Sequence, residues 1–266
     1  MHGRRQGRVH LVGAGPGDPD FLTVKALRLI GQADVVVYDR LISDEILELI
    51  PTGTARIYVG KANSRHTLSQ DEINSLLVKL ARSGHRVVRL KGGDPFIFGR
   101  GSEEAECLAR HDVPFEIVPG VTAASGCAAT VGIPLTHRGL ATGVRFVTGH
   151  CRNNQLLDLN WASLADPDTT LVIYMGLANL AEFSRRLIDA GLPPDTPAAA
   201  IAKGTTSDET LCRATLSTLP ALAPEADLEP PVLIVIGRVI GLADVLNRRS
   251  WGDERLFAEL EEAGHA

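Results

Sequence analysis

Residues 86–101 read RVVRLKGGDPFIFGRG, and this stretch decides the fold class. Val87 to Leu90 predicts a short strand, and Lys91 to Pro95 predicts a loop with paired glycines. A helix is expected from about Ser102 to Arg110, since its first turn holds acids that suit the positive end of a helix. A strand, a loop and a helix in this order form the repeating unit of an α/β protein.

The same order of elements recurs on both sides of this stretch. Val35 to Asp39 is an apolar run without alternation, which is typical of a parallel strand covered on both faces. Ser69 to Glu72 is a capping box that opens a helix ending at Gly84. We therefore expect an α/β lobe over residues 8–120 with a mainly parallel, open sheet. Its other strands are predicted at residues 8–12, 57–59 and 115–118.

A second α/β lobe is predicted over residues 121–246, after a crossing rich in Gly, Ala, Ser and Thr. Polar and apolar residues alternate from Leu211 to Leu216, which indicates antiparallel pairing and therefore a mixed sheet. Further elements are predicted as strands at residues 144–148, 171–174, 198–202 and 232–236, and as a helix at 178–190. The charged tail, residues 247–266, is treated as a separate end segment.

Several chemically distinctive residues follow the predicted strands of the first lobe. Ligands of open α/β sheets bind beyond the carboxyl ends of the strands, where Gly13 to Asp18, Asp39, Lys61 and Gly92 to Asp94 are expected. Paired glycines let a backbone approach a ligand closely, and an aspartate beside them accepts hydrogen bonds. A plain turn would explain the glycines but not the apolar residues 96–98 next to them, which favour the lining of a pocket.

The first glycine loop, Gly13 to Gly17, also suggests a dinucleotide site, with Asp39 standing where an acid would bind a ribose. The third glycine of that fingerprint is replaced by Asp18, whose carboxylate would repel a pyrophosphate. Prolines at positions 16 and 19 remove two N–H donors from the loop. A nicotinamide-dependent oxidoreductase is therefore the second hypothesis rather than the first.

The segment Pro119 to Gly126 leaves two interpretations open. Its small and hydroxyl-bearing residues could line a slot for an adenosine, or Thr122 could cap the start of a helix. Basic residues near the predicted rim and lobe crossing could together bind a polycarboxylate, because arginine pairs with carboxylates through two hydrogen bonds. They are Lys61, His66, Arg100, His137, Arg138, Arg145, His150 and Arg152.

Composition narrows the range of partners. The 266 residues carry 27 basic and 32 acidic side chains, a formal net charge of −5, which argues against nucleic acid as a partner. The four cysteines and the histidines lack the spacing of a metal site, so no metal is expected. No apolar stretch approaches the ~20 residues that span a bilayer, and no signal peptide is recognisable. We expect a cytoplasmic protein that does not enter a membrane.

In these motifs the sequence resembles the tetrapyrrole methylases, from about Val9 to Asp244. The segment Pro134 to Arg138, followed by Val147 to His150, narrows the resemblance to members that methylate uroporphyrinogen III. The segments that carry the resemblance to the family are residues 12–19, 38–41, 59–61, 89–101, 118–126 and 132–138.

The resemblance implies two α/β lobes with S-adenosylmethionine in the cleft between them, and a homodimer. It implies two successive methyl transfers to uroporphyrinogen III, a small-molecule tetrapyrrole, giving precorrin-2 via precorrin-1 on the route to cobalamin and sirohaem. It also implies a proton acceptor at Asp39 and a proton donor at Lys61. The cofactor contacts that it implies are Pro16, Gly92, Gly93, Asp94, Ile97, Thr122, Ala123, Met175 and Gly204.

The chain departs from the family pattern at one position of interest. The family commonly has Gly-Lys-Arg where this chain has Gly60-Lys61-Ala62, and the change bears on a substrate carboxylate rather than on the cofactor. Some relatives carry a dehydrogenase and ferrochelatase domain ahead of this region, and without it we expect methylation only. A non-catalytic tetrapyrrole-binding protein is the third hypothesis.

Overall fold

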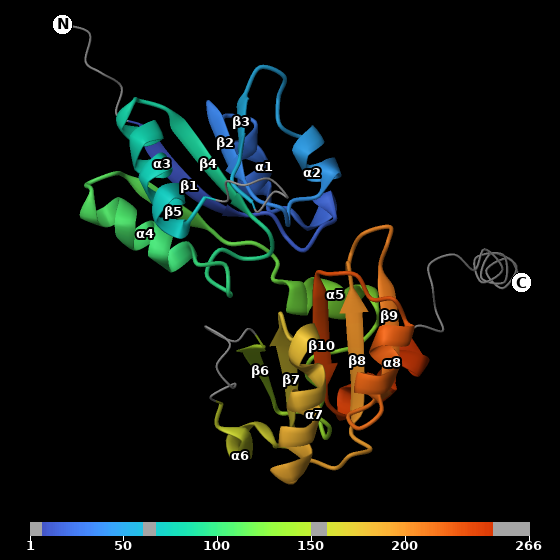
Figure 1. The fold of residues 1–266 in the computed structure, drawn as a ribbon. Coiled ribbons are helices and arrows are strands. Elements are labelled where there is room, and N and C mark those ends of the chain that lie inside the picture. The colour runs from blue at the N-terminus through green and yellow to red at the C-terminus, as the bar shows by residue number, and fades with distance from the viewer. Residues whose placement is uncertain (1–6, 61–67, 150–158, 247–266) are drawn as a thin grey trace, which may run out of the picture.

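The computed structural model describes residues 7–60, 68–149 and 159–246, which form two sheets in two separate lobes (Figure 1). The first sheet has the strand order β3-β2-β4-β1-β5, and all of its pairs are parallel, as its apolar runs predict. Its strands are β1 (Arg8–Gly13), β2 (Val35–Tyr38), β3 (Ala55–Tyr58), β4 (Arg86–Lys91) and β5 (Phe115–Val118).

Helices cover both faces of the first sheet, which explains why its strands lack a polar face. Leu77 of α3 and Leu108 of α4 are buried on one face, together with side chains of β1, β2 and β4. Ile30 of α1 and Ile46 of α2 are buried on the other face. The helices are α1 (Val24–Ile30), α2 (Asp44–Glu48), α3 (Gln70–Arg82) and α4 (Gly101–Arg110).

The second sheet is mixed, as predicted, with the order β6-β7-β10-β8-β9. β6 and β7 are parallel, whereas β10 is antiparallel to both of its neighbours. β9 is antiparallel to β8, in agreement with the alternation in its sequence. The strands are β6 (Gly143–Thr148), β7 (Thr169–Tyr174), β8 (Pro197–Ala202), β9 (Thr210–Thr215) and β10 (Val232–Ile236).

The helices of the second lobe also lie on both faces of their sheet. Phe183 of α7 and Leu219 of α8 are buried in the core of one face, with Trp161 of α6 packed against it. Cys127 of α5 and Ala243 of α9 are buried in the core of the other face. α5 lies on the side of this lobe that is nearer to the first lobe (Figure 1). These helices are α5 (Ala123–Thr130), α6 (Trp161–Leu164), α7 (Leu180–Asp189), α8 (Leu219–Glu225) and α9 (Ala243–Leu246).

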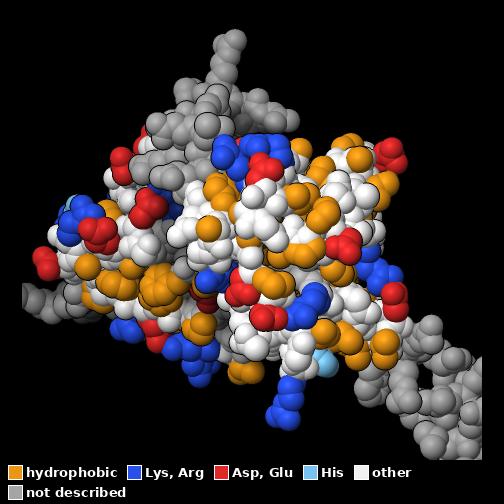
Figure 2. Space-filling view, turned by 90° about the horizontal axis from the view of Figure 1, so that it is seen from below, with side chains coloured by type: hydrophobic (Ala, Val, Ile, Leu, Met, Phe, Trp, Pro, Cys, Tyr) orange, Lys and Arg blue, Asp and Glu red, His pale blue; other side chains and the backbone are white. Residues whose placement is uncertain are grey.

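The helix expected at residues 178–190 begins differently from the prediction. A 3-10 turn, Leu177–Asn179, precedes α7, and no side chain caps the start of the α-helix. Within the described residues, no helix is long and apolar enough to cross a membrane. On the face drawn in Figure 2, acidic, basic and apolar side chains are interspersed, so this face carries no extended field of one sign. The predicted tail, residues 247–266, lies outside the described residues.

Candidate functional site

Three loops that follow neighbouring parallel strands pack backbone against backbone. A Cβ added to Gly13, at the end of β1, would lie 2.5 Å from the nitrogen of Gly120 and 2.7 Å from the carbonyl oxygen of Gly93. Gly15 and Gly93 also form an antiparallel bridge, in which Gly93 N–H donates to the Gly15 carbonyl at 2.6 Å. Gly93 has a φ of 68°, a conformation that favours glycine. Larger residues at these positions would force the loops apart.

The carboxylate of Asp94 joins two of these loops. Its Oδ2 accepts a hydrogen bond from the backbone N–H of Gly120 at 3.0 Å, and its Oδ1 accepts one from Phe96 N–H at 2.8 Å. Hydrogen bonds to a carboxylate are stronger than those between neutral groups. Asp94 therefore fixes the loop after β4 to the loop after β5, and Ile97 N–H closes the turn onto the Asp94 carbonyl.

Tyr174, the last residue of β7, connects the second sheet to these loops. Its hydroxyl lies 2.6 Å from Thr122 Oγ1 and accepts a hydrogen bond from Ala124 N–H at 3.0 Å. Thr122 is the N-cap residue of α5, but its own side chain makes no capping bond, so the tyrosine hydroxyl takes that role. Burial raises the pKa of Tyr174 above its ordinary value, which already lies well above neutral pH. Its ring also contacts that of Phe98 from the first lobe.

The first glycine loop contacts the second lobe at two points. A Cβ added to Gly126 of α5 would lie 2.5 Å from Pro16 Cγ. Asp18 N–H donates to Thr205 Oγ1 at 3.2 Å. Gly204, beside Thr205, is buried, and a Cβ there would overlap the sulfur of Cys127. Pro16 and Gly204 therefore both lie beside α5, against its adjacent residues Gly126 and Cys127.

Left-handed backbone conformations gather around the same loops. Among the described residues, five of the seven non-glycine residues with positive φ lie in them, namely Phe98, Arg100, Met175, Lys203 and Thr205. Such conformations cost of order 1–3 kcal/mol each and persist only where the surroundings impose them, which is common at ligand sites. Met175 directly follows Tyr174, and this residue is 52% exposed.

Asp39 follows β2 and is held by a buried arginine. Its Oδ2 accepts a hydrogen bond from Arg89 Nη2 at 3.0 Å, and its Oδ1 accepts one from Leu41 N–H at 3.1 Å. Leu41 in turn packs against Gly92, where an added Cβ would lie 2.7 Å from Leu41 Cβ. Asp39 is therefore connected to the second glycine loop through its neighbour. Its side chain stays partly exposed, so that one face of the carboxylate can meet a ligand.

The structure brings together most of the residues that the sequence singles out. Asp39 is connected to this group through Leu41. Lys61 and Ala62 lie outside the described residues. Seven of the predicted cofactor contacts take part in the loop and helix contacts above, while Ala123 follows Thr122 and Met175 follows Tyr174 in the chain. The seven are Pro16, Gly92, Gly93, Asp94, Ile97, Thr122 and Gly204.

The basic residues expected near the rim do not form one group. Arg100 pairs with Glu103 at 2.6 Å, and Arg145 Nη1 donates to Ser163 Oγ at 2.6 Å. His137 bridges to Ala141 in a turn of the second lobe. Arg138 is exposed in the same turn, and the remaining predicted members, Lys61, His66, His150 and Arg152, lie outside the described residues.

The first glycine loop does not form the start of a helix that a pyrophosphate would need. Asp18 caps a 3-10 turn, Pro19–Phe21, by accepting a hydrogen bond from Asp20 N–H. The α-helix begins only at Val24, after Thr23 has capped it. The negative charge of Asp18 therefore lies where a dinucleotide would place its phosphates, which disfavours the oxidoreductase hypothesis.

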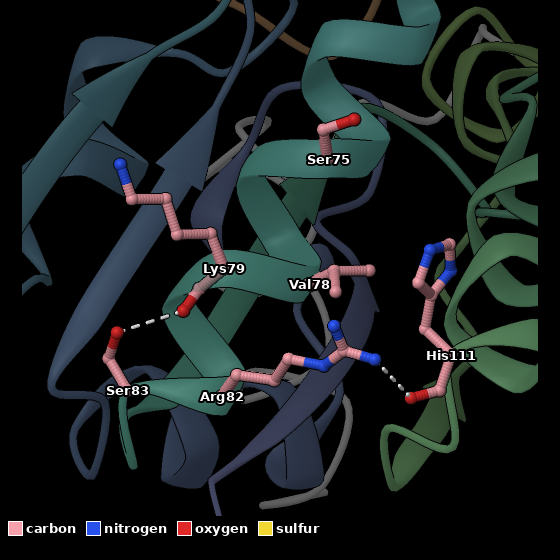
Figure 3. A pocket seen from close by; sticks show the side chains of 6 residues that line it. All are labelled: Ser75, Val78, Lys79, Arg82, Ser83 and His111. Carbon is pink, nitrogen blue, oxygen red and sulfur yellow. Dashed lines mark hydrogen bonds between the residues drawn. The ribbon is translucent and has the colours of Figure 1, made fainter.

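A separate pocket lies at the other end of the first sheet, near the amino ends of its strands (Figure 3). It is formed where α3 and α4 end, before β4 and β5 begin, so it is remote from the carboxyl ends of the strands. Arg82 donates to the carbonyl of His111 across it, and Ser83 to that of Lys79. Its basic residues stand at helix C-termini, where positive charge offsets the helix dipole, so they need no ligand to explain them. No group of three His, Cys, Asp or Glu side chains among the described residues could hold a metal ion.

Sequence reasoning missed three residues of this site: Tyr174, Arg89 and Glu104. Arg89 and Lys91 are charged residues inside a strand that is covered on both faces, so each needs a buried partner. The acids at the start of the following helix supply one, because Glu104 is fully buried and pairs with both of them. Tyr174 carries a weaker signal, a tyrosine at the carboxyl end of a strand.

Comparison with known proteins adds a family and close relatives. The family model for Tetrapyrrole (Corrin/Porphyrin) Methylases matches residues 8–220. A uroporphyrinogen-III C-methyltransferase of Paracoccus denitrificans is 55% identical over 238 residues, covering 90% of this chain and 83% of that protein. A siroheme synthase of Nitrosospira multiformis is 56% identical over 89% of this chain, and the chain spans about half the length of such synthases, 50% in this case.

A solved structure agrees with the observed fold. The uroporphyrin-III C-methyl transferase of Thermus thermophilus, complexed with S-adenyl homocysteine, matches with a TM-score of 0.76 and 42% identity. The match covers 88% of this chain and 99% of that one. It therefore includes both sheets and the loops between them.

Proposed function

This chain belongs to the tetrapyrrole methylase family, and we propose that it transfers methyl groups from S-adenosylmethionine to carbon atoms of uroporphyrinogen III. Two successive transfers would give precorrin-2 via precorrin-1, on the route to sirohaem and cobalamin. The observation that carries the proposal is the packing of three strand-end loops against α5, with Asp94 and Tyr174 fixing them. The relatives named above, and the ligand of the Thermus structure, agree with it.

The residues present fit the proposed cofactor. Gly93 leaves room for close approach, because an added Cβ there would come no nearer than 3.8 Å to a neighbouring atom, and the N–H of Ala123 at the first turn of α5 has no acceptor within the helix. Apolar side chains of Phe98 and Met175 are exposed beside these polar groups, which suits a ligand with a base, a ribose and a thioether. S-adenosylmethionine, when bound, supplies a methyl group on a positively charged sulfur.

The residues of the site must also orient the substrate and accept the proton that it loses. Methyl transfer to carbon requires the acceptor atom to be held in line with the donor bond, so positioning supplies much of the rate. We assign to Asp39 the stabilisation of positive charge that develops on the pyrrole ring, and the acceptance of the proton that leaves it. Lys61 is proposed as the proton donor.

We place the boundary between the lobes after residue 120, with lobes over residues 8–120 and 121–246. The support is that Ala124 and Cys127 of α5 pack with Val172 and Leu233 of the second sheet. We also propose that the protein acts in the cytoplasm as a homodimer. Exposed apolar side chains on α1, Val24 and Leu27, are compatible with such contacts between copies.

Calorimetric titration with S-adenosylmethionine, followed by an anaerobic transfer assay with uroporphyrinogen III, tests the function. Binding together with transfer supports the proposal. Binding of the tetrapyrrole without any transfer would favour a non-catalytic carrier, and binding of a nicotinamide dinucleotide alone would favour an oxidoreductase.

A further inference from the structure

A cluster of four charged residues lies behind the candidate site. Glu104, Arg89 and Lys91 are 0%, 3% and 4% exposed, and Arg89 extends from them to Asp39. Glu104 Oε1 accepts from Arg89 Nε at 3.2 Å and from Lys91 Nζ at 3.0 Å. Two cations thus face two carboxylates, and the cluster is formally neutral. Buried charges that are balanced in this way avoid most of the cost of an unpaired ion.

Every side of the Arg89 guanidinium is occupied. Nε donates to Glu104, Nη1 donates to the carbonyl of Leu90 at 2.8 Å, and Nη2 donates to Asp39. A planar group held at three points has one orientation, unlike a flexible ammonium. The position of the Asp39 carboxylate therefore depends on contacts that Arg89 makes deeper in the protein.

Glu104 is the deepest member of this chain of contacts. It lies in the first turn of α4, where an exposed acid would suffice to satisfy the helix dipole, yet it is fully buried. Gln70 of α3 donates to the same oxygen at 3.3 Å, whereas Glu104 Oε2 has no hydrogen-bond partner among the described residues. A buried carboxylate with one unpartnered oxygen costs stability, so its presence here calls for a role that an exposed acid could not fill. Burial also lowers the pKa of Lys91, beside Arg89.

We propose that Glu104 is a positioning residue that fixes Arg89, and through Arg89 sets the position of the Asp39 carboxylate in the methyl-transfer reaction. The inference rests on the proposed function, in which Asp39 meets the substrate. Glu104 itself is too deeply buried to touch a ligand, so its effect is expected in kcat rather than in cofactor binding.

A double-mutant cycle tests this proposal. Glu104→Gln preserves shape and one acceptor oxygen but removes the charge, and it is combined with Asp39→Asn. Glu106→Gln on the same helix is the matched control, since Glu106 is exposed and pairs with Arg110 at the surface. Because Glu104→Gln leaves two buried cations with one carboxylate and could unfold the chain, Glu104→Gln/Lys91→Met provides a charge-balanced variant.

We expect Glu104→Gln to lower kcat about tenfold, with KM for uroporphyrinogen III and Kd for S-adenosylmethionine changed less than twofold. In the Asp39→Asn background the same substitution should lower kcat less than twofold, and the charge-balanced variant should keep the tenfold loss. Three results would each overturn the proposal. They are an equal loss of kcat in both backgrounds, a parental kcat in a folded Glu104→Gln protein, and full recovery of kcat in the charge-balanced variant.

A parent chain that transfers no methyl group contradicts the proposed function alone. The carboxyl-carbon resonance of Asp39 in the carbon-13 NMR spectrum then decides the inference. A changed resonance in Glu104→Gln, or in the charge-balanced variant, with none in Glu106→Gln, supports it. An unchanged resonance overturns it.

Discussion

The rings of Phe98 and Tyr174 contact each other across the two lobes, with centroids 4.9 Å apart and planes tilted by 52°. Phe98 comes from the loop after β4, and Tyr174 ends β7. The hydroxyl of the same tyrosine caps α5. One side chain of the second sheet therefore contacts both the first lobe and the start of α5. The geometry of the candidate site therefore depends on this contact.

Tyr174→Phe should keep the ring contact and remove the cap. Ala124 N–H then loses its acceptor, which costs about 1–2 kcal/mol of unfolding free energy. We expect Kd for S-adenosylmethionine to rise about fivefold, because Thr122 and Ala123 lose their support. Calorimetric titration and thermal unfolding measure both effects. Phe98→Leu, which leaves the hydroxyl in place, serves as the comparison, and an unchanged Kd in Tyr174→Phe would contradict the assignment.

Asp94→Ala should weaken cofactor binding at least tenfold, because it removes both acceptors that join the loops after β4 and β5. Asp94→Asn retains one acceptor oxygen, so its loss should be smaller. The two Kd values are compared by calorimetry. A Kd for Asp94→Ala within a factor of two of the parent would show that these loops hold their arrangement without the carboxylate.

Asp39→Asn should lower kcat about a hundredfold while leaving Kd for S-adenosylmethionine unchanged. The amide keeps the shape of the side chain but cannot accept a proton from the substrate. Steady-state kinetics separate the two parameters, with Asp44→Asn, an exposed acid at the start of α2, as the control. Parental kcat in Asp39→Asn would remove Asp39 from the reaction.

Gly204→Ala should destabilise the protein by about 1–3 kcal/mol, because the added methyl group overlaps the sulfur of Cys127. Burial raises the pKa of Cys127 to about 12, so this sulfur is a neutral thiol that acts as packing. Cys127→Ala in the same chain should recover part of the loss, because it removes the sulfur and leaves only the Cβ of residue 127, 2.9 Å from the added methyl group. Thermal unfolding of the single and double variants checks this coupling, and additive losses would argue against the contact.

The acid stability of the first lobe should depend on Asp34. The Arg86 guanidinium and backbone N–H, which donate to this carboxylate, lower its pKa from 3.8 to about 2. A pKa that falls on folding adds stability above the unfolded value, and this stability is lost as pH drops towards 2. Asp34→Asn should therefore have a lower Tm than the parent at pH 7, and the difference should disappear between pH 4 and pH 2. A constant difference over that range would contradict the pairing.

Local signals predicted the frame of the fold correctly. The capping box is present as written, with Ser69 accepting from Glu72 N–H and the Glu72 carboxylate accepting from Ser69 N–H. Unbroken apolar runs gave parallel strands, and alternation gave the antiparallel strand β9. These patterns succeed because each depends on residues that are neighbours in the chain.

The parts that the sequence could not predict depend on contacts between distant residues. The Tyr174 hydroxyl acts 50 residues away on Ala124, and Arg89 reaches 50 residues back to Asp39. The acids at the start of α4 suited the helix dipole equally well, yet only Glu104 turned into the core. No spacing rule distinguishes it from Glu103, because burial is decided by how α4 packs on the sheet.

The most direct test of the account is an anaerobic assay of the purified chain with methyl-labelled S-adenosylmethionine and uroporphyrinogen III, read by mass spectrometry. We predict a tetrapyrrole product that has gained two labelled methyl groups. A folded chain that binds no S-adenosylmethionine and returns the tetrapyrrole unlabelled would contradict the central claim.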